Sequence, residues 1–353
     1  MAQRTLRDPE ALIEAGLAPE SARAEIDAVN ARYAIAVTPE MAAQIDASDP
    51  HDPIAAQFIP DPRELRTRPE ELSDPIGDEA HSPVPGIVHR YPDRALLKVV
   101  QVCPVYCRFC FRRESVGPQH GGALPRAELD DAIDYLRDHP EIWEVILTGG
   151  DPMILSPFRM RHVMERLAEI DHIRIIRLHT RVPVVTPAHV DDALIAALKS
   201  AGKAVYVALH ANHPKEFTKN ARAAIARLVD AGIPMLSQSV LLRGINDDLD
   251  TLTALMRSFV ELRVKPYHLN HGDLAPGTAH FRTTIAEGRA LVGALRGRLS
   301  GLCQFFYVLD IPGGAGKAVL NPDAIEAAEA NGELIIRDWQ GGRHGYRDST
   351  SDT

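Results

Sequence analysis

Short apolar segments alternate with helical segments from Ala95 to Leu309, and this alternation limits the possible folds more than any other feature of the sequence. The predicted strands are Ala95–Val102, Trp143–Leu147, Ile173–Leu178, Ala204–Leu209, Pro234–Val240, Val264–Leu269 and Gln304–Leu309. The predicted helices between them are Leu124–Arg137, Pro157–Ile170, Asp191–Ser200, Lys215–Asp230, Asp248–Leu262 and Thr284–Leu299. This order implies a parallel sheet with right-handed crossovers. We expect an α/β fold with a full or partial (β/α) barrel of about six units. A doubly wound sheet is the competing topology.

The chain divides by pattern into three parts. Residues 1–90 form a helical or irregular appendage, in which Asp8-Pro9 and Thr38-Pro39 each predict a helix start because a capping side chain precedes a proline. Residues 91–320 form the barrel core, and residues 321–353 form a short C-terminal tail. The appendage carries no catalytic pattern, so we expect it to act as a cap or an oligomer contact.

Three cysteines lie close together after the first predicted strand of the core. Cys103, Cys107 and Cys110 have the spacing C-x3-C-x2-C. Three thiolates on one loop can hold three irons of a [4Fe–4S] cluster and leave the fourth iron open for another molecule. In radical S-adenosylmethionine (SAM) enzymes that molecule is SAM.

A structural zinc site is the alternative interpretation of these cysteines. Such sites draw two pairs of ligands. The remaining cysteine, Cys303, stands alone, so a second pair is missing from the sequence. The spacing therefore favours the cluster.

The strand Trp143–Leu147 ends in Thr148-Gly149-Gly150-Asp151-Pro152. Two glycines let the backbone approach a ligand closely, although glycine pairs also make ordinary tight turns. One unit after the cysteine loop, this turn resembles the segment of radical SAM enzymes that holds the amino group of SAM. We expect Asp151 to add an anionic partner.

A glycine-rich stretch follows the last predicted strand of the core. It reads Asp310-Ile311-Pro312-Gly313-Gly314-Ala315-Gly316-Lys317. Lysine forms the Schiff base with pyridoxal 5′-phosphate (PLP), and glycines leave room for the ring. A phosphate-binding P-loop does not fit because Ala318 follows Lys317 and the glycine spacing is wrong. A lysine in a plain turn is the other alternative.

The segment after the strand Val264–Leu269 holds several polar residues. Asp273 lies just past the strand, where a substrate cation could bind, although many loop aspartates only cap helices. His268, His271 and His280 do not have the spacing of a known metal site. We expect no metal there.

Composition excludes several classes of function. The net charge of -9 argues against nucleic acid as a partner. No apolar run reaches the roughly 18 residues that span a bilayer, and we expect no signal peptide. Clustered cysteines fit a reducing cytoplasm. We therefore expect a cytoplasmic enzyme, with no membrane partner.

Together these stretches resemble the lysine 2,3-aminomutase family, over roughly residues 85 to 320. The resemblance rests on His89–Arg94, the cysteine loop with Arg112-Arg113, Thr148–Pro152, Arg177–Pro183, His210–Pro214, Gln238–Asn246, Asp273–Thr283 and Asp310–Lys317. It implies an isomerase that moves the α-amino group of L-lysine to the β-carbon, with a [4Fe–4S] cluster, SAM and PLP as cofactors. It also implies a reductase of the flavodoxin or ferredoxin type and possible homo-oligomers.

The resemblance assigns a role to individual residues. Cys103, Cys107 and Cys110 would ligate the cluster. Lys317 would hold PLP, with Tyr91 and Arg94 at its phosphate. Thr148, His210 and Gln238 would contact SAM. Arg112 would pair with the substrate carboxylate, and Asp273 and Asp310 would bind the ε-ammonium of lysine; such ion pairs are charge-assisted.

Departures from the family leave alternatives open. The clostridial-type enzymes have a C-terminal zinc site made of cysteines, whereas no cysteine follows Cys303 here, so we expect no zinc. The short tail matches members that supply β-lysine for the modification of elongation factor P. The alternatives are an aminomutase for arginine or glutamate, a radical SAM enzyme without PLP, and a zinc-binding interaction protein.

Overall fold

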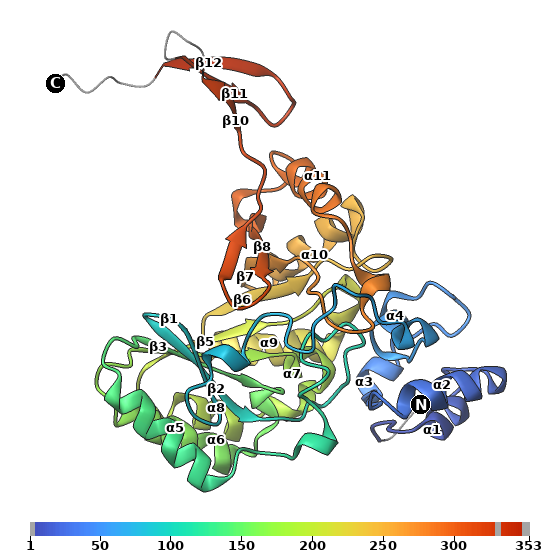
Figure 1. Ribbon diagram of the computed structural model, residues 1–353, viewed down its shortest axis with the longest axis vertical. Helices are drawn as coiled ribbons and strands as arrows, with labels where there is room; N and C mark the ends of the chain where they lie inside the picture. Colours follow the sequence, from blue (N-terminus) through green and yellow to red (C-terminus); the bar gives the residue numbers. More distant parts are fainter. Residues whose placement is uncertain (1–3, 329–332, 348–353) are drawn as a thin grey trace.

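The computed structural model describes residues 4–328 and 333–347. In this part of the chain the strands form a nine-stranded sheet and a separate three-stranded sheet (Figure 1). The strands of the large sheet are β1 Ile87–Tyr91, β2 Arg94–Val100, β3 Glu144–Gly149, β4 Ile175–Thr180, β5 Ala204–Leu209, β6 Met235–Val240, β7 Val264–Asn270, β8 Phe306–Ile311 and β9 Gly316–Val319.

The large sheet is a partial barrel with its strands in sequence order. Strands β2 to β8 pair in parallel, and the edge strands β1 and β9 pair antiparallel with β2 and β8. A doubly wound sheet would reverse its strand order at a switch point. Because the order here never reverses, the prediction of a partial (β/α) barrel is confirmed.

The open side of the barrel lies between β1 and β9, which do not pair with each other within residues 4–328 and 333–347. The backbone N–H of Lys317 on β9 donates to the Tyr91 hydroxyl at the end of β1, at 2.7 Å. A Cβ on Gly316 would lie 2.8 Å from that same hydroxyl oxygen. The glycine therefore lets the two edges approach each other beside Lys317.

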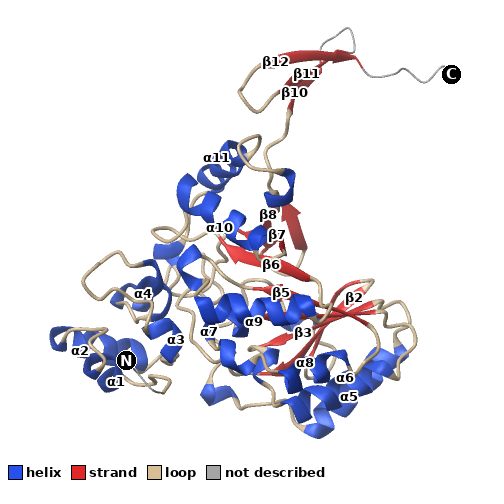
Figure 2. Cartoon of the chain, turned by 180° about the vertical axis from the view of Figure 1, so that it is seen from behind, coloured by secondary structure: helices blue, strands red, loops and turns tan. Residues whose placement is uncertain are grey.

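Helices follow the strands as predicted and cover the outside of the sheet (Figure 2). The helices after β2 are α5 Arg126–Asp138, α6 Pro157–Ala168, α7 Val182–Val185, α8 Asp192–Lys199, α9 Lys219–Asp230, α10 Leu249–Glu261 and α11 Ile285–Leu295. Helix α11 begins with a capping box, in which Thr284 and Glu287 satisfy each other's backbone N–H groups. Local capping therefore explains why this helix begins where the sequence predicts.

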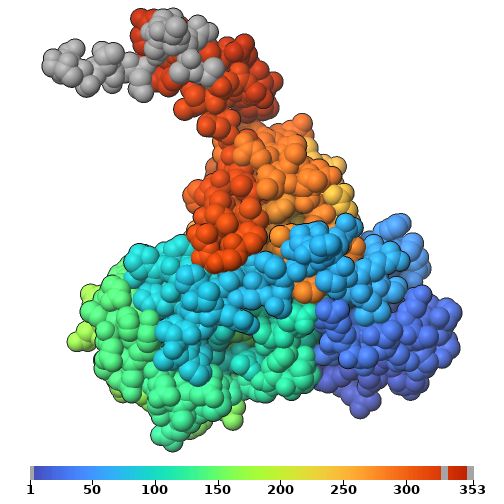
Figure 3. Space-filling model, in the orientation of Figure 1, coloured from blue at the N-terminus to red at the C-terminus, as the bar shows by residue number. Residues whose placement is uncertain are grey.

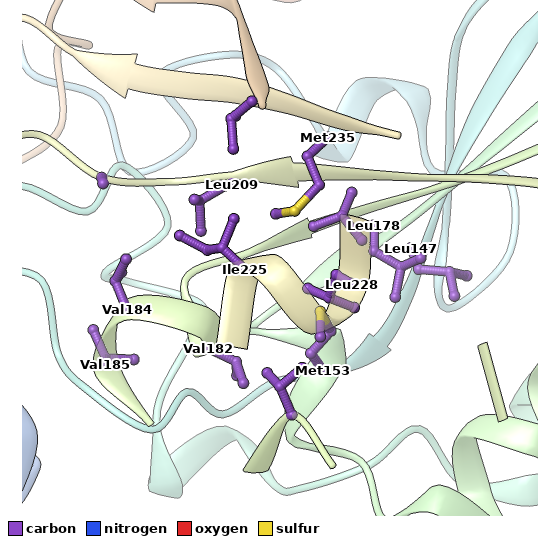
Figure 4. Packing of buried hydrophobic residues seen from close by; sticks show 14 of the residues in the cluster. Leu147, Met153, Leu178, Val182, Val184, Val185, Leu209, Ile225, Leu228 and Met235 are labelled. Carbon is purple, nitrogen blue, oxygen red and sulfur yellow. The ribbon is translucent and has the colours of Figure 1, made fainter. Parts of the chain in front are cut away.

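The core lies between the sheet and these helices (Figure 4). Ile225 and Leu228, on one face of α9, pack toward Leu178, Leu209 and Met235 of the strands. Strands buried on both faces read as continuous apolar runs, and helices as one apolar stripe. These two patterns are why the barrel is predictable from the sequence.

The N-terminal part contains four short helices in the described chain, α1 Pro9–Glu14, α2 Arg23–Asn30, α3 Pro39–Ala42 and α4 Pro53–Phe58. Asp8 and Thr38 cap α1 and α3 as predicted. Figure 3 shows this blue part lying against the barrel rather than apart from it. The boundary predicted at residue 90 falls inside β1, which pairs with β2.

The strands β1 and β9 were not predicted, because each is short and lies at an edge. Gly313 and Gly314 have left-handed φ angles of 81° and 88°, which turn the chain back so that β9 pairs with β8. Lys317 is consequently on a strand and not in a loop.

The predicted C-terminal tail forms a small sheet of β10 Ile325–Ala328, β11 Glu333–Arg337 and β12 Arg343–Arg347, which projects from the body (Figure 1). Trp339 contacts Gly297, which follows the end of α11. A Cβ atom placed on this glycine would lie only 2.3 Å from the indole ring. The tail residues 329–332 and 348–353 lie outside the described residues. Across the residues that are described, no helix is both long and apolar enough to cross a membrane.

Candidate active site

One cavity of about 830 Å³ occupies the inside of the partial barrel. It is large enough for a cofactor together with a substrate. All the site residues predicted from the sequence line it: Tyr91, Arg94, Cys103, Cys107, Cys110, Arg112, Thr148, Gly149, Gly150, Asp151, His210, Gln238, Asp273, Asp310 and Lys317. The carboxyl ends of parallel strands meet at one edge of a barrel, which brings together residues far apart in the chain.

The three cysteine thiols lie along one loop on the cavity wall. Burial raises the pKa of all three thiols, for Cys110 to about 11, so they need a positive partner in order to ionise. Arg181 Nη1 donates to Cys107 Sγ at 2.9 Å. In the described residues no group of three metal-ligating side chains is already arranged around a metal position. Three half-buried thiols on one loop still form a donor set for an iron–sulfur cluster.

The N-terminal part fixes the cysteine loop through buried ion pairs. Glu64 accepts from Arg108 at 2.7 to 3.1 Å and also from Arg113, and all three side chains are almost fully buried. The backbone N–H groups of Tyr106 and Arg108 donate to the carbonyl oxygens of Ala36 and Gln57, each at 2.9 Å. The segment predicted to be an appendage therefore holds the loop in place.

The glycine turn after β3 packs against the cysteine loop. A Cβ atom on Gly149 would lie 2.2 Å from the carbonyl oxygen of Val100, and one on Gly150 would lie 2.2 Å from that of Val102. The backbone N–H of Gly150 donates to the carbonyl oxygen of Val100 at 2.6 Å. Glycine is required here because two backbone segments touch. Both glycines also line the cavity, so the turn shapes its wall.

Asp151 is committed to neighbouring protein groups. Its carboxylate accepts from the Thr180 hydroxyl and the Arg181 N–H, both at 2.6 Å, and from the Met153 N–H at 3.1 Å. Burial raises its pKa, whereas these donors act in the opposite direction. The geometry assigns Asp151 to holding the end of β4, although the residue also borders the cavity.

His210 and Gln238 present polar groups to the cavity. Burial lowers the pKa of His210 to about 3, so its ring is neutral, and its Nε2 has no partner among the described residues. The ring stacks on Phe109 of the cysteine loop, with 5.7 Å between centroids. The Gln238 side chain also makes no hydrogen bond within the described chain. Such groups are suited to a ligand.

Lys317 lies at the opposite wall of the cavity. Its Nζ donates to Asn270 Oδ1 at 3.1 Å and pairs with Asp310. The Tyr91 hydroxyl accepts a hydrogen bond from the backbone N–H of Lys317. The guanidinium of Arg94 stacks on the Tyr91 ring, with its central carbon 3.8 Å from the ring centroid. The two residues predicted at the PLP phosphate therefore stand beside the predicted PLP lysine.

Asp273 is a half-buried carboxyl group that forms neither a hydrogen bond nor an ion pair within the described chain. Burial, and then the nearby charge of Asp310, raise its pKa to about 7. Arg112 is paired with Asp78 at 2.8 Å and reaches Thr148 Oγ1 at 3.4 Å. Both groups line the same cavity, so a cation and an anion of one ligand could bind there together.

Sequence reasoning assigned no role to several residues at this site, although the stretch Arg177–Pro183 belongs to the resemblance. Arg177, His179, Arg181, His268 and Asn270 also line the cavity, and each lies on or just after a strand. Burial lowers the pKa of His179 well below its usual range, and its Nε2 has no partner among the described residues. Their position at strand ends is the signal that could have assigned them a role.

Comparison with known proteins places this site in a family. The sequence model of the radical SAM superfamily matches residues 97–255, so the chain contains a radical SAM domain. L-lysine 2,3-aminomutase of Clostridium subterminale is 39% identical over 307 residues, which cover 87% of this chain and 73% of that protein. A putative L-lysine 2,3-aminomutase of Aquifex aeolicus is 40% identical over 300 residues, 85% of this chain and 80% of that protein. The chain belongs to the lysine 2,3-aminomutase family, whose members are isomerases.

Two further similarities set limits on this result. Glutamate 2,3-aminomutase of Clostridioides difficile is 35% identical over 316 residues, 90% of this chain and 74% of that protein. A radical SAM methyltransferase structure from Sphaerobacter thermophilus covers 65% of this chain and 71% of that chain, with a TM-score of 0.46 and 20% identity, which is too distant to bear on function. Membership in the radical SAM superfamily implies SAM and a [4Fe–4S] cluster, and the three clustered thiols and the unpartnered Nε2 of His210 fit them.

Proposed function

We propose that this protein is an L-lysine 2,3-aminomutase that uses the cluster, SAM and PLP to convert L-lysine into β-lysine. The observation that supports this most is the shared cavity, in which half-buried Asp273 lacks a protein partner among the described residues and lies within electrostatic reach of Asp310, Lys317 and Arg112. A buried carboxylate needs a cation, and the ε-ammonium of lysine supplies one.

Three residues are proposed to hold PLP. Lys317 supplies the amine, and beside it lie Tyr91, at the end of the edge strand β1, and Arg94, at the start of β2. The Nε2 atom of His179, in the same cavity, is buried and has no partner among the described residues. This atom could receive a polar group of the cofactor, which supports the proposal. When bound, PLP supplies an aldehyde that captures amines and a ring system that delocalises an unpaired electron.

The two carboxylates and Arg112 are proposed to orient the substrate. Arg112 would bind the lysine carboxylate, and its ion pair with Asp78 holds the guanidinium in position. Asp273 and Asp310 would bind the ε-ammonium. In the structure Asp310 pairs with Lys317. Once the Lys317 amine is engaged elsewhere, Asp310 can accept the substrate cation.

The barrel interior would keep water away from the reacting atoms. Between these polar groups the cavity is lined by apolar side chains of the strands, among them Leu96, Ile146, Leu236 and Val308. Excluding water strengthens the ion pairs and protects a reactive radical from other hydrogen donors. The reaction also requires a one-electron donor of the flavodoxin or ferredoxin type and a reducing compartment such as the cytoplasm.

Substrate choice is proposed from charge. Asp273 and Asp310 would repel the side-chain carboxylate of glutamate, whereas both lysine and arginine carry a distal cation. The relatives from Clostridium subterminale and Bacillus subtilis, the latter 37% identical, are L-lysine 2,3-aminomutases. Lysine is therefore the first substrate to test.

The test is anaerobic incubation of the full chain, reconstituted with iron and sulfide, with SAM, PLP, a low-potential reductant and one amino acid. Separate reactions contain lysine, arginine or glutamate, and the products are identified by mass spectrometry after derivatisation. We expect β-lysine from lysine only. A β-amino acid formed only from arginine or glutamate would contradict the substrate, turnover without PLP would contradict the cofactor, and a protein that binds zinc but no iron would contradict the enzyme itself.

A further inference from the structure

Arg181 occupies a buried position directly between the cysteine loop and the N-terminal part. It follows β4, is 5% exposed and lines the cavity. Its Nη1 donates to Cys107 Sγ at 2.9 Å, and its Nη2 donates to Gln57 Oε1 at 2.6 Å and to Glu216 Oε2 at 2.7 Å. One guanidinium thus joins a proposed cluster ligand to two fixed acceptors.

The acceptors of Arg181 are themselves held firmly. Glu216 Oε1 accepts from the backbone N–H groups of Asn212 and His213 at 2.8 and 3.0 Å, and the Gln57 amide donates to Pro53 O at 3.0 Å. The Arg181 backbone N–H is bonded to Asp151. Because both its backbone and its guanidinium are anchored, Arg181 cannot turn away from the sulfur without breaking several buried hydrogen bonds.

The three cysteines differ in this respect. In the part of the chain that the structure describes, Cys107 receives a hydrogen bond from a charged side chain, whereas Cys103 and Cys110 receive none from any side chain. The guanidinium also lies 4.7 Å from the centroid of the buried Phe58 ring and 5.6 Å from that of Phe109, so two aromatic rings, together with Glu216 and Gln57, shield its charge from water. Weak screening strengthens its effect on the sulfur.

We propose that Arg181 sets the reduction potential of the cluster by donating to the sulfur of Cys107, an inference that rests on the proposed ligation by the three cysteines. A reduced cluster carries one more negative charge than an oxidised cluster. A hydrogen bond and a positive charge at a ligating sulfur therefore stabilise the reduced form and raise the potential. Arg181 is in this sense a positioning residue, which makes the electron easier to receive from the external donor.

The test compares midpoint potentials of the full-length chain, reconstituted anaerobically with iron and sulfide, by redox titration followed by electron paramagnetic resonance. Arg181→Gln removes the charge, and we expect the equilibrium constant for reduction to fall about tenfold, which is about 59 mV for a one-electron couple. Arg181→Lys keeps the charge but loses the forked geometry, and we expect a smaller fall.

Arg227→Gln is the matched control, because the Arg227 guanidinium is likewise held by hydrogen bonds, to the backbone oxygens of Val190 and Pro187, but lies outside the cavity. Its potential should equal that of the unchanged protein. A potential for Arg181→Gln that is unchanged or more positive would overturn the inference, as would folded Arg181 variants that both fail to hold a cluster. A wild-type chain without a cluster would instead overturn the proposed function, so the two failures are distinguishable.

Discussion

The cavity has two walls that treat buried charge in different ways. At the cysteine loop, Glu64 is shared by Arg108 and Arg113, and Arg181 is bound by Glu216 and Gln57, so every one of these charges has a protein partner. At the opposite wall, Asp273 and the buried Nε2 of His179 have none within the described residues. Charged groups that have protein partners hold a wall rigid. Polar groups without a protein partner destabilise the fold unless a bound ligand supplies the missing hydrogen bond or charge.

The comparison also separates support from chemistry. The partners at the cysteine loop come from the N-terminal part and from loops after distant strands. The groups at the other wall come from β4, β7, β8 and β9 and from the loops that follow the last three of these strands. If this division is correct, substitutions at the first wall should reduce stability and cluster retention, and substitutions at the second should reduce ligand binding while leaving the fold intact.

The largest effect is expected at Lys317. Replacing Lys317 by alanine should abolish the visible absorbance of enzyme-bound PLP, because the amine that attaches the cofactor is removed. Lys199→Ala, at the exposed end of α8, is the control and should keep the band. An unchanged spectrum in the Lys317 variant would remove this residue from the proposed role.

Glu64 tests the rigid wall. Changing Glu64 to glutamine leaves Arg108 and Arg113 without a buried counter-charge, and removing one partner of a buried pair destabilises a protein by about 3–5 kcal/mol. We expect a loss of this size in the free energy of unfolding, measured by chemical denaturation, together with a loss of bound iron. Glu10→Gln, whose partner Arg23 is at the surface, should cost about 1 kcal/mol or less. Equal effects of the two changes would contradict the comparison.

Asp273 tests the unsatisfied wall. Asp273→Asn should weaken lysine binding by about 2–5 kcal/mol, which is at least about thirtyfold, because a buried cation loses its counter-charge. Binding of SAM should stay the same. Both affinities can be measured by calorimetry, with the exposed Asp230→Asn as control. Equal losses for lysine and SAM would show that Asp273 does not bind the substrate.

The pH dependence of lysine binding gives the smallest expected effect. Since the pKa of Asp273 is raised to about 7 by burial and by Asp310, the group is mostly neutral below that pH and ionised above it. Lysine affinity should therefore rise as pH rises through 7, and be about tenfold weaker at pH 6 than at pH 8. Asp273→Asn should flatten this profile. A profile that keeps its slope in the variant would assign the titration to another group.

The same shift predicts how stability depends on pH. The ordinary pKa of an aspartate is 3.8, whereas that of Asp273 in the folded chain is about 7. At a pH between these two values, the folded chain keeps a proton on Asp273 that the unfolded chain has released. The contribution of this group to stability therefore falls as pH rises through that window. Comparing the unfolding free energy of the wild type and Asp273→Asn across the window measures it.

Most of the barrel and of the site could be predicted because both follow local patterns. Buried strands and amphipathic helices have different periods, and a polar residue directly after a strand lies at the mouth of a barrel. Cys103 was singled out by the cysteine spacing, Lys317 by the glycine-rich stretch and Asp273 by its position just past a strand, and all three line the cavity. The edge strands β1 and β9 were missed because a short edge strand carries too few buried side chains to show a period.

The sequence by itself determined the βα order, the cysteine spacing and the residues at the strand ends, because these are encoded by neighbouring positions. Only the tertiary structure decided that Glu64 would hold the cysteine loop, that Arg181 would reach Cys107 and that Tyr91 would meet Lys317. In these three contacts, the two residues that meet are 44, 74 and 226 positions apart in the sequence. No local period relates such positions, and a charge finds its partner only when the packing of the whole chain removes both from water.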